Sequence, residues 1–195
     1  MGKREWRAAR IVLFALTPMA PGGAMLSAPA QAAGLLAPDA VGLTGGYSNS
    51  VAVYGVALSW NLPPPHFLLP DNGFAARIDA QLAYWHGQER PTPNPFLWDS
   101  SVTPMLRWTN RAKTAPRFFV EAGIGIHLLS ATRINNDRLF GTAFQFGELA
   151  GVGFSFGPTG EYELGLYVEH VSNADIKKPN DGLTYPGIVL RAVLR

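Results

Sequence analysis

The chain has 195 residues, which suits a single domain, and only 15% of them are charged. It contains no cysteine, which excludes disulfide bonds, thiolate catalysis and cysteine-based metal sites. The formal net charge of +2 arises in a short N-terminal segment, where four basic side chains face only Glu5. These basic residues are Lys3, Arg4, Arg7 and Arg10.

The first 32 residues have the pattern of a secretory signal peptide. The basic segment is followed by an apolar run over residues 11–16, and small residues then lead to Ala30-Gln31-Ala32. We expect residues 1–32 to be removed, with cleavage after Ala33 as the close alternative. Of the 16 basic and 14 acidic side chains, four and one lie in this leader, which leaves 12 and 13 and a net charge of −1. Residues 33–195 are therefore expected to form one exported domain with no nucleic-acid partner.

From residue 40 onward the sequence predicts β-strands separated by turns. No later run reaches the ~20 apolar residues of a membrane helix, but most predicted strands reach the ~9–11 residues of a membrane strand. Pro-rich segments at 62–73 and 88–98 connect strands, and 135–137 and 157–160 have the composition of turns. The eight predicted strands are 40–47, 50–61, 74–87, 99–109, 117–129, 143–156, 161–173 and 182–195.

Apolar and polar side chains alternate along these strands, so that one face is continuously apolar. In 117–129, for example, Phe118 and Val120 share the apolar face, whereas Glu121 and His127 share the opposite face with glycines. A soluble barrel turns its apolar face inward, whereas a membrane barrel turns it outward to lipid. Inside a narrow eight-stranded barrel, opposite charges have to pair. The interior charges expected to do so are Arg77, Asp79, Arg107 and Glu121.

Aromatic residues near the strand ends favour the membrane alternative. With both termini in the periplasm, three of them fall near the periplasmic rim and three near the outer rim, as two interfacial girdles require. The first group is Trp60, Trp108 and Tyr162, and the second is Tyr84, Trp85 and Tyr185. The sequence therefore predicts an all-β, eight-stranded antiparallel barrel that spans the bacterial outer membrane.

A histidine and a serine stand two residues apart at the end of the predicted strand 161–173. Every second residue of this strand shares its apolar face, and this series continues to His170 and Ser172. Both should therefore face lipid at the outer end of the strand. Exposing polar side chains to lipid costs free energy, so residues of this kind are expected there only where they have a function. A histidine within reach of a serine is the pairing of base and nucleophile that acyl transfer uses.

The longer pattern around this pair is specific. His170-x-Ser172-Asn173-Ala174 is followed after four residues by Pro179-Asn180-x-Gly182. It closely resembles the signature of the PagL family, the outer-membrane lipid A 3-O-deacylases, and the similarity extends upstream through residues 119–125 and 146–153. It covers roughly the C-terminal half of the mature chain well and the N-terminal half only by pattern.

This resemblance implies a serine esterase that acts on lipopolysaccharide in the outer leaflet, with no metal or cofactor. Ser172 would attack the carbonyl of the 3-O-linked 3-hydroxyacyl chain of lipid A, and His170 would act as base and then as acid. Asn180 matches the oxyanion-stabilising asparagine of the family. Asn173 is assigned to the substrate-binding surface and could also order the loop. The resemblance leaves a homodimer open.

One position departs from the family pattern, in which an acid falls two residues after the glycine. Here that residue is Thr184, which has a hydroxyl group but no charge. Pairing strands 143–156 and 161–173 about their tight turn sets Glu148 roughly opposite Glu169 to His170, and Phe146 beside Ser172. We therefore expect Glu148 to orient His170, with Thr184 as a weaker partner, and Phe146 to wall the acyl-chain site. Alternatively, Glu148 is a rim carboxylate that meets water.

Other functions and simpler interpretations remain open at this point. A non-enzymatic small barrel, such as an adhesin, explains the leader and the alternation but not the lipid-facing histidine and serine. An outer-membrane phospholipase would show a calcium requirement. The remaining polar residues are interpreted as structural or solvated rather than as metal or phosphate ligands. These are His66, His86, His127, Lys177 and Lys178.

Overall fold

The computed structural model describes residues 37–63, 65 and 73–194. The expected leader and its cleavage site lie outside these residues. No helix in the described part of the chain is long and apolar enough to cross a membrane. The strands are β1 (Ala40–Ser48), β2 (Val51–Leu62), β3 (Phe74–Gly87), β4 (Phe96–Thr109), β5 (Arg117–Leu129), β6 (Arg133–Ile134), β7 (Arg138–Leu139), β8 (Phe144–Phe156), β9 (Tyr162–Ser172) and β10 (Leu183–Val193).

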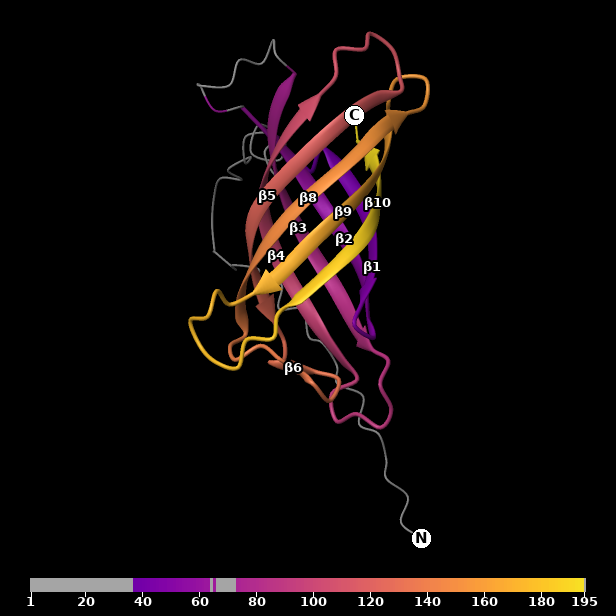
Figure 1. Ribbon diagram of the computed structural model, residues 1–195. Helices are drawn as coiled ribbons and strands as arrows, with labels where there is room; N and C mark the ends of the chain where they lie inside the picture. The colour runs from indigo at the N-terminus through magenta and orange to yellow at the C-terminus, as the bar shows by residue number, and fades with distance from the viewer. Residues whose placement is uncertain (1–36, 64, 66–72, 195) are drawn as a thin grey trace, which may run out of the picture. The chain divides into compact units, whose positions relative to one another are not determined.

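Eight of these strands close into an antiparallel barrel in the order β1-β10-β9-β8-β5-β4-β3-β2, as Figure 1 shows. The barrel closes through β1 and β10, which pair from Ala40 with Val193 to Gly46 with Gly187. Closure leaves no sheet edge unpaired, which is what a strand structure needs in lipid. The predicted all-β, eight-stranded antiparallel barrel is confirmed.

Two details differ from the sequence prediction. β4 begins at Phe96 rather than at 99, because residues 96–98 pair with 84–86 of β3 and so continue the ladder into the Pro-rich segment. The connection between β5 and β8 also contains the short hairpin of β6 and β7, where only a turn was predicted.

The two ends of the barrel are distinguished by their connections. The connections 88–95, 130–143 and 173–182 gather at one end, which we call the outer end. The first residue of β1 and the last residue of β10 lie at the opposite, inner end (Figure 1). With the termini in the periplasm, the outer end faces the cell exterior.

The apolar face of the wall lies outside. Large apolar side chains such as Leu82, Ile124 and Leu166 are more than half exposed, whereas Arg77 and Glu121 are buried inside. This is the arrangement of a membrane barrel and the reverse of a lipocalin-type barrel. The alternation predicted for β3, β4 and β5 is therefore confirmed.

The expected pairing of interior charges is also confirmed. Arg77 binds Asp79 at 2.7 Å and Glu121 at 2.9 Å, and Arg107 binds Glu121 at 2.6 Å. Arg107 also binds Glu163 of β9, so this cluster crosses the barrel from one wall to the other. Buried charges of one sign are costly unless partners of the other sign satisfy them, and here each has several.

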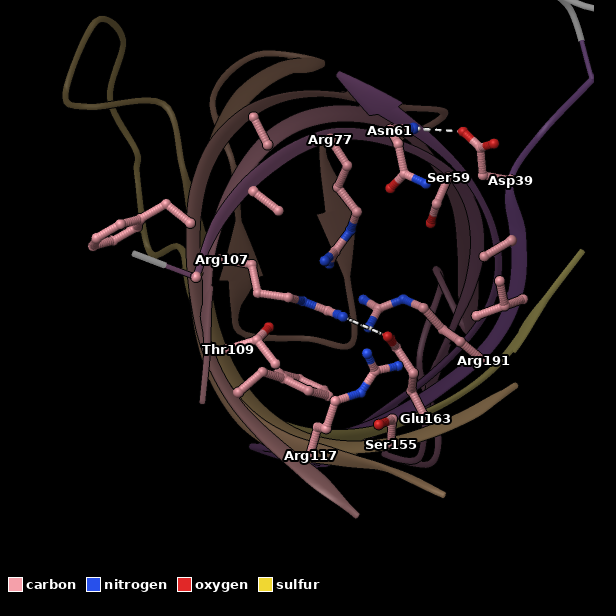
Figure 2. A pocket seen from close by; sticks show the side chains of 17 residues that line it. Asp39, Ser59, Asn61, Arg77, Arg107, Thr109, Arg117, Ser155, Glu163 and Arg191 are labelled. Atoms are coloured by element: carbon pink, nitrogen blue, oxygen red, sulfur yellow. Dashed lines mark hydrogen bonds and ion pairs between the residues drawn. The ribbon is translucent and has the colours of Figure 1, made fainter. Parts of the chain in front are cut away.

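A cavity of about 500 Å³ opens at the inner end beside this cluster (Figure 2). Its lining includes Asp39 and Val193, which lie next to the barrel termini, and arginines from β3, β4, β5 and β10. The cavity therefore lies at the opposite end of the barrel from His170 and Ser172.

The prediction of two aromatic girdles is confirmed at the inner end and is partly wrong at the outer end. Trp108 and Tyr162 face outward at the inner rim, as predicted. Trp85 and Tyr185, predicted for the outer girdle, are fully buried inside the barrel. Their strand parity turns them inward, because each neighbours a residue that faces lipid. Outward aromatic residues of the outer rim include Tyr47, Tyr54, Tyr84, Phe96, Trp98 and Phe144.

Candidate active site

The outer end of β9 presents two polar side chains on the lipid-facing side of the wall. His170 and Ser172 continue the outward face after Val168, and both are half-buried. Glu169 and Val171, which alternate with them, point inward and are buried. The structure therefore brings the histidine and the serine to one side of the strand, at the outer end of the barrel wall.

The flanking strands bring other predicted residues to this pair. In the antiparallel register Phe146 of β8 lies opposite Ser172, and Glu148 lies opposite His170. On the other side Thr184 of β10 lies opposite His170. Residues directly opposite in such a ladder have Cβ atoms roughly 4.5–5.5 Å apart. Three adjacent strands thus supply the site.

His170 is held by Thr184. Its Nδ1 lies 2.7 Å from the hydroxyl oxygen of Thr184. When Nδ1 carries the hydrogen, it donates to this oxygen, and Nε2 is then left to accept a proton from a neighbouring hydroxyl. The hydroxyl fixes the ring orientation but brings no negative charge to it.

Gly182 closes over both residues at the start of β10. A Cβ atom on this glycine would lie 3.2 Å from Cε1 of His170 and 3.3 Å from Cβ of Ser172. Its φ of +57° is also in the left-handed region that favours glycine. The glycine of the motif is therefore needed for both its conformation and its close approach to the histidine and the serine.

The loop 173–182 is ordered by its asparagines. Asn173 is fully buried, and its amide nitrogen donates to the carbonyl oxygens of Phe140 and Lys177, both at 2.7 Å. Asn180 accepts a hydrogen bond from the backbone N–H of Asn173 at 3.0 Å and donates to Asp175 at 3.0 Å. Asn173 is therefore placed to order the loop from inside rather than to touch substrate.

Lys178 adds an exposed ion pair to the same loop. Its Nζ lies 2.7 Å from the Asp175 carboxylate. Hydrogen bonds from Lys178 and Asn180 lower the pKa of the Asp175 carboxyl group below its usual value. Because the pair is exposed, it orders the loop more than it stabilises the fold.

The neighbouring outer connection supports the loop. Arg138 donates to the carbonyl oxygen of Gly182 at 2.7 Å, and the Asp181 carboxylate accepts from the backbone N–H of Leu139 at 2.7 Å. The hairpin of β6 and β7 therefore holds the start of β10 against the site. The sequence alone did not identify Arg138, because no local pattern links it to a loop more than 40 residues away.

Glu148 and Phe146 lie on the other side of the pair. The carboxylate of Glu148 is exposed on the lipid-facing side of β8, opposite His170. Phe146 packs edge-to-face on Phe144 with ring centroids 5.1 Å apart. Phe146 therefore stands beside Ser172 as part of an aromatic surface, whereas the ring of His170 is hydrogen-bonded on the Thr184 side.

An apolar groove begins on the wall just below this site. It lies on the outer surface of β5, β8, β9 and β10, has a volume of about 500 Å³ and includes Val152, Leu166 and Val168. Val168 precedes His170 by one step on the same face of β9. The groove thus runs from the polar pair towards the middle of the membrane-spanning wall.

The site combines a histidine, a serine, a threonine and a glutamate from three adjacent strands. Among residues 37–63, 65 and 73–194, no group of three His, Asp or Glu side chains is placed to hold a metal ion. The family model described as "Lipid A 3-O-deacylase (PagL)" matches residues 52–192. The chain belongs to the lipid A 3-O-deacylase (PagL) family.

Individual relatives agree with this family. "Lipid A deacylase PagL" of Pseudomonas aeruginosa is 33% identical over 86% of this chain and 92% of its own length. The protein of the same name from Bordetella bronchiseptica is 42% identical, over 52% of either chain. The crystal structure of "the outer membrane enzyme PagL" matches with a TM-score of 0.67 at 24% identity, over 80% of this chain and 99% of that one. This last likeness concerns the fold.

The two neighbours of His170 can be separated by mutation. We predict that Thr184→Ala lowers kcat about tenfold, because the ring loses the hydrogen bond that selects its tautomer. Thr184→Glu should match or exceed wild-type kcat.

Glu148→Gln should lower kcat by a similar factor if its carboxylate supports the imidazolium. Steady-state kinetics on lipid A measure all three. An unchanged kcat in Glu148→Gln would leave Glu148 as a solvated rim carboxylate.

Proposed function

We propose that this barrel hydrolyses the 3-O-linked 3-hydroxyacyl ester of lipid A, with Ser172 as nucleophile and His170 as general base. The observation that carries the proposal is the position of the pair. Both residues face lipid at the outer end of β9, in a chain that belongs to the lipid A 3-O-deacylase family. An ester of an outer-leaflet lipid can reach a nucleophile there without leaving the membrane.

In the first step the hydroxyl oxygen of Ser172 attacks the ester carbonyl. Nε2 of His170 takes the hydroxyl proton, while Nδ1 keeps its hydrogen bond to Thr184. The carbonyl oxygen becomes a tetrahedral oxyanion. The positive charge on the ring is then offset by Glu148 if its carboxylate turns towards His170 across the β8–β9 ladder.

In the second step the intermediate collapses. The bond to the sugar oxygen breaks, and His170 returns its proton to that oxygen, which frees the 3-hydroxyl group of lipid A. The acyl chain remains as an ester on Ser172. Water, activated by the same histidine, then hydrolyses this ester and releases a 3-hydroxy fatty acid.

Asn180 is the proposed oxyanion partner. One hydrogen of its amide nitrogen bonds Asp175, which leaves the second hydrogen for the oxyanion. The bond from the backbone of Asn173 to its side-chain oxygen holds the amide in one orientation. Such a preorganised donor is worth about 10²–10³ in kcat in other hydrolases.

The apolar groove is the proposed site of the acyl chain. It starts one step below His170, and the lining residues that face outward are apolar, so a chain that enters it stays in a lipid-like environment. Phe146 would then flank the ester end of this chain. Arg138 and the lysines of the loop 173–182 lie on the solvent side, towards the sugar.

An assay of the purified barrel in mixed micelles separates this function from its alternatives. We expect release of a 3-hydroxy fatty acid from lipid A, none from phospholipids, and no effect of a calcium chelator. Calcium-dependent release from phospholipids would instead identify a phospholipase. No release from either lipid by a folded barrel would favour a non-enzymatic small barrel. A homodimer stays a prediction, which crosslinking in the membrane tests.

A further inference from the structure

A second polar cluster lies directly behind the proposed catalytic pair, on the inner side of the wall. Glu169, between the pair in sequence, is only 4% exposed, and its carboxylate accepts a hydrogen bond from the hydroxyl of Tyr185. Glu169 and Tyr185 are opposite each other in the β9–β10 ladder, one step from His170 and Thr184. Two adjacent residue pairs of this ladder are therefore joined by side-chain hydrogen bonds. His170 and Thr184 are joined on the outer face of the wall, and Glu169 and Tyr185 on the inner face.

The pair of Glu169 and Tyr185 inside the barrel is connected to His127 of β5, which is separated from β9 by β8 alone. Nε2 of His127 lies 3.4 Å from the Glu169 carboxylate, and its Nδ1 lies 2.9 Å from Asp99 of β4. The side chains of His127 and Asp99 are completely shielded from solvent. This chain of contacts, from Tyr185 through Glu169 and His127 to Asp99, is called the inner network below.

The inner network lies inside the barrel behind His170 and Ser172, at the outer end, and it is separate from the arginine cluster at the opposite end. Among the described residues no arginine or lysine pairs with Glu169 or Asp99, so His127 is the basic partner of both. On the side of Tyr185 the barrel interior is aromatic, with Trp85 packed edge-to-face on Tyr185 at 6.0 Å. Burying two carboxylates and an imidazole there carries a desolvation cost that apolar side chains would not carry.

The network is also fitted to β8, which carries Phe146 and Glu148. Gly147, between them, points inward at the ring of His127, and a Cβ atom on this glycine would overlap the ring. The imidazole therefore occupies the space of a missing side chain in the strand that flanks the site. A shift of His127 would be transmitted to β8 as well as to β9.

We propose that the inner network, with Tyr185 and Glu169 at its centre, positions His170 and Ser172 for the deacylation proposed above. Successive residues of a strand point to opposite faces, so anchoring Glu169 inside fixes the direction in which His170 points outside. Catalytic rates are sensitive to such placement, and a displacement of about 1 Å can cost about 10² in rate. Tyr185 and Glu169 touch no substrate, and they act only through the backbone of β9 and β10.

The decisive variant is Tyr185→Phe, which removes one hydroxyl group and keeps the aromatic packing. We expect kcat to fall about tenfold while KM stays within about twofold, because the groove is untouched. The rate at which a phosphonate labels Ser172 should fall by a similar factor. Tyr167→Phe is the matched control, since it removes another interior hydroxyl from β9, and it should keep wild-type kcat and labelling.

Glu169 variants provide the rescue. Glu169→Gln keeps an acceptor for Tyr185 and should retain more of the wild-type kcat than Glu169→Ala. The shift between heated and unheated protein on gel electrophoresis reports whether each barrel is folded. Wild-type kcat and labelling in a folded Tyr185→Phe barrel would overturn the positioning role, even if Glu169→Ala fails to fold.

The Ser172→Ala barrel, assayed in parallel, separates this inference from the function on which it rests. If Ser172→Ala is inactive and Tyr185→Phe is fully active, only the positioning role fails. If Ser172→Ala keeps wild-type activity, the proposed nucleophile is wrong, and the network has no catalytic pair to position.

Discussion

Replacing Ser172 by alanine is expected to lower kcat for lipid A deacylation by about 10⁴-fold or more, with little change in KM. The reason is that no other hydroxyl group is proposed to form the acyl intermediate, whereas the groove proposed to bind the acyl chain is unchanged. The measurement is the rate of fatty-acid release from lipid A by the purified, folded barrel.

A matched control for this variant is Ser100→Ala. Ser100 also lies exposed on the lipid-facing side of the barrel, but on β4, three strands away from β9. It should keep wild-type kcat. If Ser172→Ala loses less than tenfold, the reaction does not use this serine as nucleophile, and a water-based mechanism around His170 would have to be considered.

Replacing His170 by asparagine should be nearly as damaging, with a loss in kcat of about 10⁴-fold. Asparagine keeps a polar side chain beside Thr184 but can neither take the serine proton nor return it to the sugar oxygen. Phosphonate labelling of Ser172 should also become slow, because the serine is no longer activated. Labelling measures this activation without any contribution from lipid A binding.

His86→Asn is the matched control for this second variant. His86 lies at the outer end of β3 on the same outward face as Tyr84, and its Nε2 contacts Arg90 at 3.1 Å. We expect wild-type kcat and labelling from it. Rapid labelling of Ser172 in the His170→Asn barrel would show that another base activates the serine, and Glu148 would be the next residue to change.

The fold was predictable because the period of a strand is two and one face must be apolar. The parity of 161–173 alone placed His170 and Ser172 on the lipid-facing side, and the structure agrees. The tight turn 157–160 made the β8–β9 register predictable to within one residue, and the partner of Glu148 is His170, one of the two residues expected. Local sequence was therefore sufficient wherever a short turn joins two strands.

Other features depend on contacts that no local pattern encodes. The outer connection 173–182 is long, so the β9–β10 register, and with it the bond between His170 and Thr184, could not be derived from turn length. Trp85 was placed in a girdle by its height in the barrel, although its parity turns it inward. The contact between His127 and Glu169 passes over Gly147 of the intervening strand β8, and no local pattern links these two residues.

The measurement that most directly tests the account is mass spectrometry of lipid A from cells that express this chain. The wild-type barrel should remove one 3-hydroxyacyl group from lipid A, and the Ser172→Ala barrel, shown to be folded in the outer membrane, should leave lipid A unchanged. Unchanged lipid A with a folded wild-type barrel, or the same loss of mass with Ser172→Ala, would contradict it.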